Sequence, residues 1–486
     1  MASGRAVKAG IWSTVDLVVR LVVSFVTSII LARILTPADF GIFALVMFFV
    51  MVSQVLVDRG LATALIQGQA ESADQKNALF WTTLTIAAVM AVAIGLMAPS
   101  FAAYFRYPVL QPLLYVCAGI VVVSALASVP TAILQRELRF EAIAKTGLVS
   151  SSVSAVAAVV AALYGAGVWS FAIQAGAYSV INSALIWIRC DWRPGPWPRF
   201  GEAALMLRFG SFVTLSSLMD VVYMNAASLI IGRLHGAADL GFFNRAQNLQ
   251  NLPGNILAAI VTRVALPLFS AQQHDHDALR RGVRLVQGAI MLVNLPLMVA
   301  MVVMPDLIVG FLYGAKWLST APLLAIMAFG GVLFPLQIVN MQLVLSQGRS
   351  GLSFKVEAIK KLIGLIAIFA GSAFGLTGVA IGLAASIYLG YAINAGVAGR
   401  MIGYRPLAQL RDLVGVLAAS LVMGVAIAAL RWMLSPGTAA ELFILTGWGM
   451  LVYASVVLLA RVGVTDELVA LTPVSRFIDR IPRLRR

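Results

Sequence analysis

Residues 28–43, S-I-I-L-A-R-I-L-T-P-A-D-F-G-I-F, return 200 residues later as S-L-I-I-G-R-L-H-G-A-A-D-L-G-F-F at residues 228–243. Aligned without a gap, the two copies share serine, arginine, alanine, aspartate, glycine and phenylalanine at equivalent positions. In each copy we expect an apolar helix that ends in arginine, a short Asp-Gly turn, and a second apolar helix. Self-similarity at a fixed spacing indicates repeated structural units. We therefore predict two homologous lobes.

The composition indicates an integral membrane protein. The 486 residues are 61% hydrophobic and only 11% charged, with a mean hydropathy of +0.94. Soluble domains carry roughly 25% charged residues. The apolar run from Ile11 to Leu35 is too long for the core of a signal peptide and is predicted to be an uncleaved first span. Cys117 and Cys190 form no pattern typical of a disulfide or a metal site.

Apolar blocks of about 20 residues, the length that crosses the hydrocarbon core, recur along the whole chain. The predicted fold class is an all-α integral membrane protein with about fourteen transmembrane helices. The predicted spans are residues 11–35, 41–66, 78–98, 109–134, 146–165, 168–189, 207–232, 239–265, 285–305, 318–346, 356–374, 377–399, 410–431 and 440–461.

The basic residues predict the orientation. With the N-terminus inside, 28 of the 35 Lys and Arg residues fall in cytoplasmic segments, six in outer connections and one, Arg20, inside the first span. Such an excess is the signature of cytoplasmic loops. We therefore expect an inner-type, multi-pass membrane protein with both termini in the cytoplasm. The net charge of +15 follows from this topology, so no nucleic-acid partner is expected.

The repeat also predicts the domain organisation. An offset of six spans is an even number, so the lobes share one orientation and form parallel repeats, as in transporter folds with a midplane site. We expect an N-lobe at 1–189 (spans 1–6), a cytoplasmic linker at 190–206 and a C-lobe at 207–404 (spans 7–12). Two extra helices and a basic cytoplasmic tail follow at 405–486.

Two equivalent spans carry polar stripes. In the first span Asp16 and Arg20 lie on one helical face with several hydroxyl side chains, and in the seventh Asp220 lies on a similar face. The shift of 200 residues places Arg20 opposite Asp220. We hypothesise that these two pair across a central cleft, or that Asp16 competes for Arg20. The alternative is a local i,i+4 pair of Asp16 with Arg20. Asp16 and Asp220 are the candidates for ion coupling or gating.

The eighth span is the most polar. Asn244, Asn248, Asn251 and Asn255 are spaced for one helical face, with Gln247 beside them. Carboxamides offer donors and acceptors without charge, which suits sugars, so we predict that these five bind substrate. Interhelical packing by amides is the alternative. Arg245 is a further candidate, for an acidic sugar or a phosphate, unless it anchors the span at the interface.

Span eleven opens with K-V-E-A-I-K-K. Glu357 and Lys361 can pair at i,i+4, which would leave Lys360 to attract a pyrophosphate at the inner mouth; positive-inside anchoring is the alternative. His274-Asp275-His276-Asp277 resembles a metal cluster but lies in a polar loop with no cysteine partners. We therefore predict no metal, no catalytic residue and no cofactor.

Seven short segments, in the right order from the first span to the eleventh, carry a family resemblance. They are L-A-R-I-L-T-P-A-D-F-G at 31–41, L-Q-R-E-L-R-F at 134–140, R-P-G at 193–195, A-D-L-G-F-F-N at 238–244, T-R-V-A-L-P-L-F at 262–269, F-L-Y-G-A-K-W at 311–317 and S-F-K-V at 353–356. As a set the chain resembles the Wzx-type polysaccharide flippases of the multidrug/oligosaccharidyl-lipid/polysaccharide superfamily, in the branch of colanic-acid exporters.

The resemblance implies two lobes around a cavity that opens to either side in turn. It also implies a cargo, an oligosaccharide repeat unit on undecaprenyl pyrophosphate, that moves from the inner to the outer leaflet. Membrane lipids, a polysaccharide polymerase and an export complex are the expected partners. The coupling ion is left open between a proton and sodium. Alternative functions are a drug/cation antiporter of the same superfamily, a membrane polymerase and a non-transporting scaffold of an assembly complex.

Overall fold

The computed structural model describes residues 2–59, 72–197, 201–434 and 439–459, and in these ranges every regular element is a helix. The contacts within the chain divide it into two compact units, Met1–Gly241 and Phe242–Arg486. The all-α fold class is confirmed. The division at residues 190–206, which follows from the repeat, stays a prediction.

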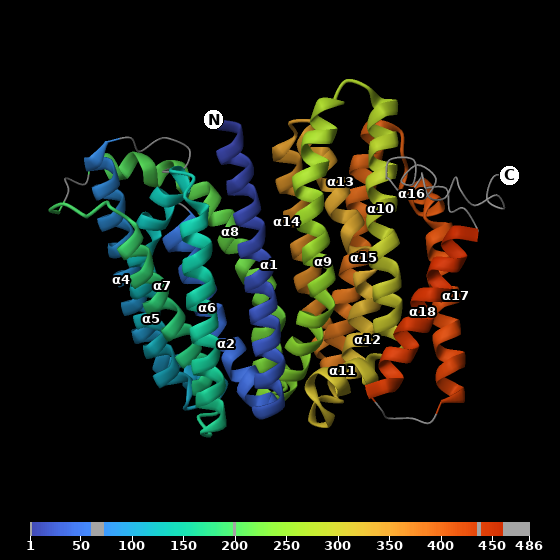
Figure 1. Cartoon of the computed structure of the whole chain (residues 1–486), viewed down its shortest axis with the longest axis horizontal. Helices are drawn as coiled ribbons and strands as arrows, with labels where there is room; N and C mark the ends of the chain where they lie inside the picture. The colour runs from blue at the N-terminus through green and yellow to red at the C-terminus, as the bar shows by residue number, and fades with distance from the viewer. Residues whose placement is uncertain (1, 60–71, 198–200, 435–438, 460–486) are drawn as a thin grey trace. The chain divides into compact units, whose positions relative to one another are not determined.

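The first unit is a bundle of long helices (Figure 1). Its elements are α1 (Ala2–Ile34), α2 (Pro37–Gln54), the π-helical turn η1 (Val55–Arg59), α4 (Ala73–Phe105), α5 (Leu110–Arg136), α6 (Phe140–Leu163), α7 (Trp169–Arg189) and α8 (Gly201–Leu234). Helix α5 packs between α4 and α7, and α6 packs on α1 and α7. The segment after α7 folds back onto α4, because Asn77 Nδ2 donates to Pro196 O (2.6 Å) and Trp81 Nε1 to Gly195 O (3.1 Å).

The second unit is built around α15. Its elements are α9 (Ala237–Ala271, which begins in the first unit), α10 (His276–Val303), α11 (Pro305–Tyr313), the 3-10 turn η2 (Ala315–Trp317), α12 (Thr320–Gly331), α13 (Phe334–Ser346), α14 (Ser350–Ser372), α15 (Gly375–Ile402), α16 (Pro406–Asp412), α17 (Val414–Met433) and α18 (Ala439–Leu459). Helix α15 packs on α12, α13 and α14, while α10 packs on α12 and α17.

One predicted span of the second unit is interrupted. Residues 318–346 form α12 and α13, and the α-helix breaks at Val332 and Leu333. Asn294 of α10 fills the break: its Nδ2 donates to Gly331 O (3.3 Å) and Val332 O (3.1 Å). A backbone carbonyl freed at membrane depth needs such a partner. This buried amide therefore stabilises the interrupted helix.

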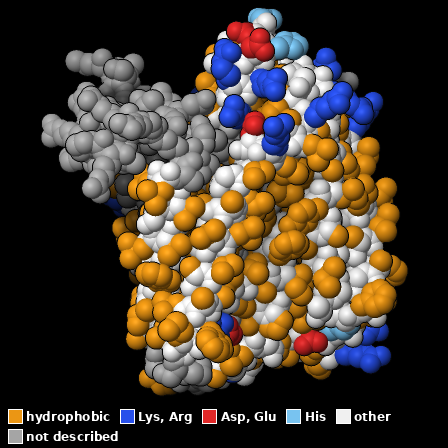
Figure 2. Space-filling model, turned by 90° about the vertical axis from the view of Figure 1, so that its right-hand side faces the viewer, with side chains coloured by type: hydrophobic (Ala, Val, Ile, Leu, Met, Phe, Trp, Pro, Cys, Tyr) orange, Lys and Arg blue, Asp and Glu red, His pale blue; other side chains and the backbone are white. Residues whose placement is uncertain are grey.

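Eleven helices of the described residues are long and apolar enough to cross a membrane, and each matches one predicted span. The three other predicted spans are covered by α1, α8 and α14, which are not among the eleven. The chain is therefore a multi-pass membrane protein, and the total of about fourteen spans stays a prediction. Figure 2 shows a broad band of hydrophobic side chains on one face, with basic and histidine side chains gathered at its upper end.

The repeated stretch forms the predicted helix–turn–helix in both copies, α1–α2 and α8–α9. The prediction that Asp and Gly form the turn is wrong, because Asp39 and Gly41 lie within α2, and Asp239 and Gly241 within α9. Where the two copies meet, inside the first unit, the contact is reciprocal. A Cβ added to Gly41 would lie 1.8 Å from Ala237 O, and a Cβ added to Gly241 would lie 1.9 Å from Pro37 O. Residues 37 and 237, like 41 and 241, are equivalent in the repeat. Glycine at both positions therefore allows the starts of α2 and α9 to cross in backbone contact.

Candidate functional site

The predicted amide face lies in the first half of α9. Asn248 and Asn255 are exposed, and Asn244, Gln247 and Asn251 are half-buried. The four asparagines fall within about 60° of the helix circumference at 100° per residue. Exposed polar groups are costly in hydrocarbon, so on a membrane span they normally face a polar interior. Asn244 already has an interaction partner, and the exposed amides of Asn248 and Asn255 are available for a hydrophilic ligand.

The opposite side of α9 is buried. Phe243 and Ala246 are fully buried and Leu249 is 4% exposed. Further along, Leu257 and Val261 join a core that includes residues of α10, α13 and α15. Helix α9 therefore packs its apolar side into the second unit and turns its amide face away from that core.

Arg245 lies among aromatic side chains. Its guanidinium lies over the ring of Tyr313 (5.9 Å to the centroid), and that ring is 6.0 Å from the ring of Trp317. Phe242 packs edge-on to Trp317 at 5.9 Å. Stacking on an aromatic face is a typical way to hold an arginine. These contacts give Arg245 a packing role between α9 and α11; the predicted role in binding an acidic group stays a prediction.

The coupling candidates lie in the first unit. Arg20 of α1 and Asp220 of α8 are half-buried, and each has an interaction partner. The side chain of Asp16 lies outside the described residues. Near Asp220, Asn225 donates to Val221 O of its own helix (2.8 Å), so part of the α8 stripe serves packing. The pairing of Arg20 with Asp220, and the coupling roles of Asp16 and Asp220, stay predictions.

The prediction that Lys360 is left unpaired is wrong. Lys360 Nζ lies 2.8 Å from Glu357 Oε1, an i,i+3 ion pair. Both i,i+3 and i,i+4 neighbours share a helix face, so sequence spacing could not choose between Lys360 and Lys361. The stem of Lys360 also reaches α15, where a Cβ on Gly390 would lie 3.1 Å from Lys360 Cε. A role in binding the substrate stays a prediction.

The second unit contains a buried network of carboxamide side chains that the sequence did not predict. Gln409 Nε2 donates to Asn340 Oδ1 (3.2 Å) and to Tyr404 O (3.1 Å), and Gln409 Oε1 accepts from Gln287 Nε2 (3.0 Å). Gln409, Asn340 and Gln287 are fully or almost fully buried. Such amides join helices as interhelical hydrogen bonds do in membranes. The chain thus uses buried amides as packing groups and keeps the α9 amides apart from them.

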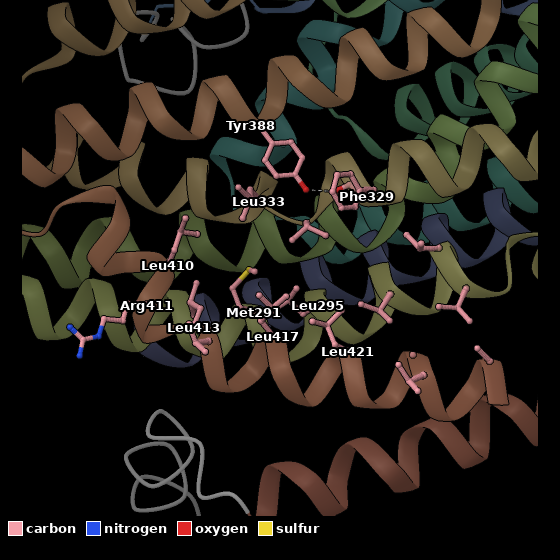
Figure 3. A pocket seen from close by; sticks show the side chains of 18 of the residues that line it. Met291, Leu295, Phe329, Leu333, Tyr388, Leu410, Arg411, Leu413, Leu417 and Leu421 are labelled. Atoms are coloured by element: carbon pink, nitrogen blue, oxygen red, sulfur yellow. Dashed lines mark hydrogen bonds between the residues drawn. The ribbon is translucent and has the colours of Figure 1, made fainter. Parts of the chain in front are cut away.

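The second unit also contains an apolar cavity of about 860 Å³. Its wall comes from α10, α12, α15, α16 and α17, and Figure 3 shows Met291, Leu295, Leu417 and Leu421 along it. Tyr388 closes one side by donating to Phe329 O (2.9 Å). The charged residue of the wall is Arg411, which Figure 3 places beside Leu410 and Leu413 at one end. An apolar cavity with a cation at its end suits a lipid chain with an anionic head.

The loop that resembles a metal cluster has a structural role. Asp275 is the N-cap of α10, where its Oδ1 accepts from the N–H groups of Asp277 (3.0 Å) and Ala278 (2.9 Å). These bonds, that of Ala278 first, hold the pKa of the Asp275 carboxyl below its usual value. His274 contacts Gln273. The His-Asp-His-Asp segment at 274–277 therefore forms the start of α10.

A bundle of apolar helices with an amide face and an apolar cavity defines a multi-pass membrane transporter. The chain belongs to the family described as "Polysaccharide biosynthesis protein", whose model matches residues 30–322.

Sequence similarity to individual proteins supports the same family. The chain is 26% identical to the lipopolysaccharide biosynthesis protein WzxC of Escherichia coli, over 78% of this chain and 77% of that one. It is 25% identical to the succinoglycan biosynthesis transport protein ExoT of Rhizobium meliloti, over 67% of this chain and 66% of that one. The lipid II flippase MurJ, in an inward closed conformation, has a similar fold, with a TM-score of 0.76 and 13% identity over 92% of this chain and 97% of that one.

Proposed function

We propose that this protein carries undecaprenyl-pyrophosphate-linked oligosaccharide units across the bacterial inner membrane, from the cytoplasmic to the outer leaflet. The units would then enter the synthesis of exopolysaccharide, capsule or O-antigen. The family, and relatives named for lipopolysaccharide and succinoglycan biosynthesis, support a saccharide cargo. The observation that carries the proposal is the exposed amide face of α9 on a candidate membrane span.

The physical task is to replace the hydration of a glycan while its isoprenoid tail stays in an apolar medium. The carboxamides of Asn248 and Asn255 can donate and accept hydrogen bonds at once, which suits sugar hydroxyls. The apolar cavity against α17 suits part of the tail, with Arg411 near the phosphate end. Rocking of the two repeats would then switch access. No covalent step is needed.

The direction and the driving force are parts of the same proposal. Both termini would lie in the cytoplasm, as the distribution of Lys and Arg predicts. Asp16 and Asp220 would couple transport to a proton or sodium gradient, with Arg20 as their partner. A polysaccharide polymerase and an export complex would receive the cargo on the outer side.

The amide face is tested in a deletion strain that carries plasmid-borne variants. Asn248→Ala with Asn255→Ala should reduce polymer at the cell surface by roughly thirtyfold, since two hydrogen bonds of about 1 kcal/mol each to the cargo are lost. Ile260→Ala is the matched control, because Ile260 is an exposed apolar residue on another face of α9. Full polymer yield from the double variant, at normal protein abundance, would remove α9 from the cargo path.

A further inference from the structure

A polar cavity of about 460 Å³ lies wholly within the second unit, at the start of α10 and the ends of α13 and α15. Three basic or potentially basic residues, His276, Arg349 and Arg400, line it together with Gln347. The remaining wall is apolar and includes Leu352 and Val397. The volume falls in the range of about 300–1,000 Å³ that is usual for small-molecule sites.

The charges around this cavity are not balanced within the described residues. Among the described residues, no carboxylate lines the cavity. The nearest acids along the chain, Asp275 and Asp277, flank His276 at the start of α10, and the Asp275 carboxylate interacts electrostatically with His276 and Arg281. In the part of the chain that the structure describes, neither Arg349 nor Arg400 has an acidic partner. The cavity therefore presents net positive charge.

Several other cations of the second unit are engaged. Arg284 Nε lies 3.5 Å from Asp412 Oδ2, and Lys360 pairs with Glu357. Arg280 lies over the ring of Tyr404 at 5.4 Å. Lys355 and Arg405, which do not line the cavity, also have no acidic partner among the described residues, as the positive-inside rule alone allows. What distinguishes Arg349 and Arg400 is that both line one cavity.

Gln347 adds a neutral donor. Its Nε2 atom is buried and has no hydrogen-bond partner among the described residues. A buried donor without an acceptor costs roughly 1–3 kcal/mol, so the amide calls for an acceptor in the cavity. The forked guanidinium groups of Arg349 and Arg400 match the oxygens of a phosphate. The apolar wall beside them suits an alkyl or prenyl ester.

We propose that this cavity binds the phosphate group of a lipid at the cytoplasmic surface. Arg349, Arg400 and Gln347 donate to its oxygens, and Leu352 and Val397 contact the ester chain. The cytoplasmic position rests on the orientation in the proposed function. The phosphate comes from one of two sources, the pyrophosphate of the lipid-linked cargo before entry or the headgroup of an anionic phospholipid.

The test measures binding by the full-length protein purified in detergent. Farnesyl diphosphate is the probe for the prenyl source, and phosphatidylglycerol, followed by native mass spectrometry, is the probe for the bulk-lipid source. Arg349→Gln with Arg400→Gln should weaken binding of at least one probe by roughly tenfold or more. Gln347→Leu should weaken the same probe by a smaller factor. Lys355→Gln with Arg405→Gln removes the same charge outside the cavity and should change affinity less than about twofold.

Loss of farnesyl diphosphate binding in the cavity variant assigns the site to prenyl diphosphates, and selective loss of phosphatidylglycerol assigns it to membrane lipid. Equal affinity of wild type and cavity variant for both probes, at equal thermal stability, overturns the inference. So does an equal loss in the Lys355/Arg405 control. Binding is read without transport, so failure of the wild-type protein to support transport would contradict the proposed function and leave this result standing.

Discussion

The two copies of the repeated turn begin their second helix in different ways. In the first copy Thr36 caps α2: its Oγ1 accepts from Asp39 N (3.3 Å), and the Asp39 carboxylate accepts from Thr36 N (2.9 Å). In the second copy the equivalent of Thr36 is Gly236, which has no side chain. At the start of α9 a different donor is satisfied, since Ala237 N–H donates to Tyr107 Oη (2.7 Å), whereas its equivalent in the first copy, Pro37, has no N–H. One start is satisfied locally and the other by a distant residue.

What both copies keep is the reciprocal contact of Gly41 with Ala237 O and of Gly241 with Pro37 O. The capping chemistry has diverged, while the glycines at the crossing have not. Backbone contact between two helices leaves no room for a Cβ, whereas a free N–H can donate to many different acceptors. The difference teaches that the crossing constrains the repeat more tightly than the caps do.

The largest expected loss of stability comes from substitutions at the contact between the starts of α2 and α9. Gly41→Ala and Gly241→Ala should each destabilise the protein by at least about 2 kcal/mol, because the new Cβ meets a backbone oxygen that has no side-chain freedom to yield. Thermal unfolding in detergent, followed by size-exclusion chromatography, measures this. Gly95→Ala and Gly119→Ala are matched controls within α4 and α5, where an added Cβ meets nothing within 4 Å. If Gly41→Ala and Gly241→Ala lowered the stability by different amounts, the two glycine contacts would not be energetically equivalent.

The next largest loss of stability is expected at the residue that precedes the second helix of each copy, Gly236 or Thr36. Gly236 has a φ of 97°, which side chains disfavour, so Gly236→Ala should cost about 1–2 kcal/mol. Thr36 has a φ of −85°, and Thr36→Gly should cost only a few tenths of a kcal/mol beyond the loss of its cap. The same thermal measurement compares the pair. A stable Gly236→Ala variant would show that this turn can relax.

Removing either of the two hydrogen bonds at the helix starts should lower the stability of the protein by a similar, moderate amount. Thr36→Ala removes the local cap of α2, and Tyr107→Phe removes the acceptor for Ala237 N–H; each should cost about 1 kcal/mol. The midpoint of thermal unfolding is the readout. A Tyr107→Phe variant as stable as the wild type would mean that water satisfies Ala237 N–H, and the contrast between a local and a distant cap would lose its energetic basis.

The smallest expected change in stability concerns a third kind of N-cap, the carboxylate of Asp275 at the start of α10. Backbone donors hold the pKa of Asp275 below its usual value, so its contribution to stability is present above about pH 4 and is lost as the pH falls through the lower folded-state pKa. Asp275→Asn keeps a capping side chain that does not titrate. Below about pH 4 the variant should therefore lose less stability than the wild type, while Tyr107→Phe should show the wild-type pH dependence. Parallel acid profiles of Asp275→Asn and wild type would contradict this.

The sequence predicted the features that depend on local pattern. Helical periodicity gave the amide face of α9, and self-similarity gave the helix–turn–helix at residues 28–43 and 228–243. It did not predict contacts between residues far apart, such as Tyr107 with Ala237. It also could not choose between Lys360 and Lys361, since both lie within reach of Glu357.

The sites formed by several helices were missed for the same reason. The phosphate-binding cavity joins His276, Gln347 and Arg400, which are more than a hundred residues apart at the extremes. Each of these is an ordinary polar residue of an inner connection in the sequence. Only the packing of α10, α13 and α15 brings them together, and no local spacing rule encodes that packing.

The measurement that tests the central claim most directly is the leaflet distribution of lipid-linked repeat units after deletion of the gene. The account predicts that complete undecaprenyl-linked units accumulate on the cytoplasmic leaflet. Plasmid-borne wild type removes them, and the Asn248→Ala/Asn255→Ala double variant removes them only at a small fraction of the wild-type rate. If no lipid-linked units accumulate and only the length of the polymer changes, the protein acts in polymerisation or assembly, and the account of a flippase is contradicted.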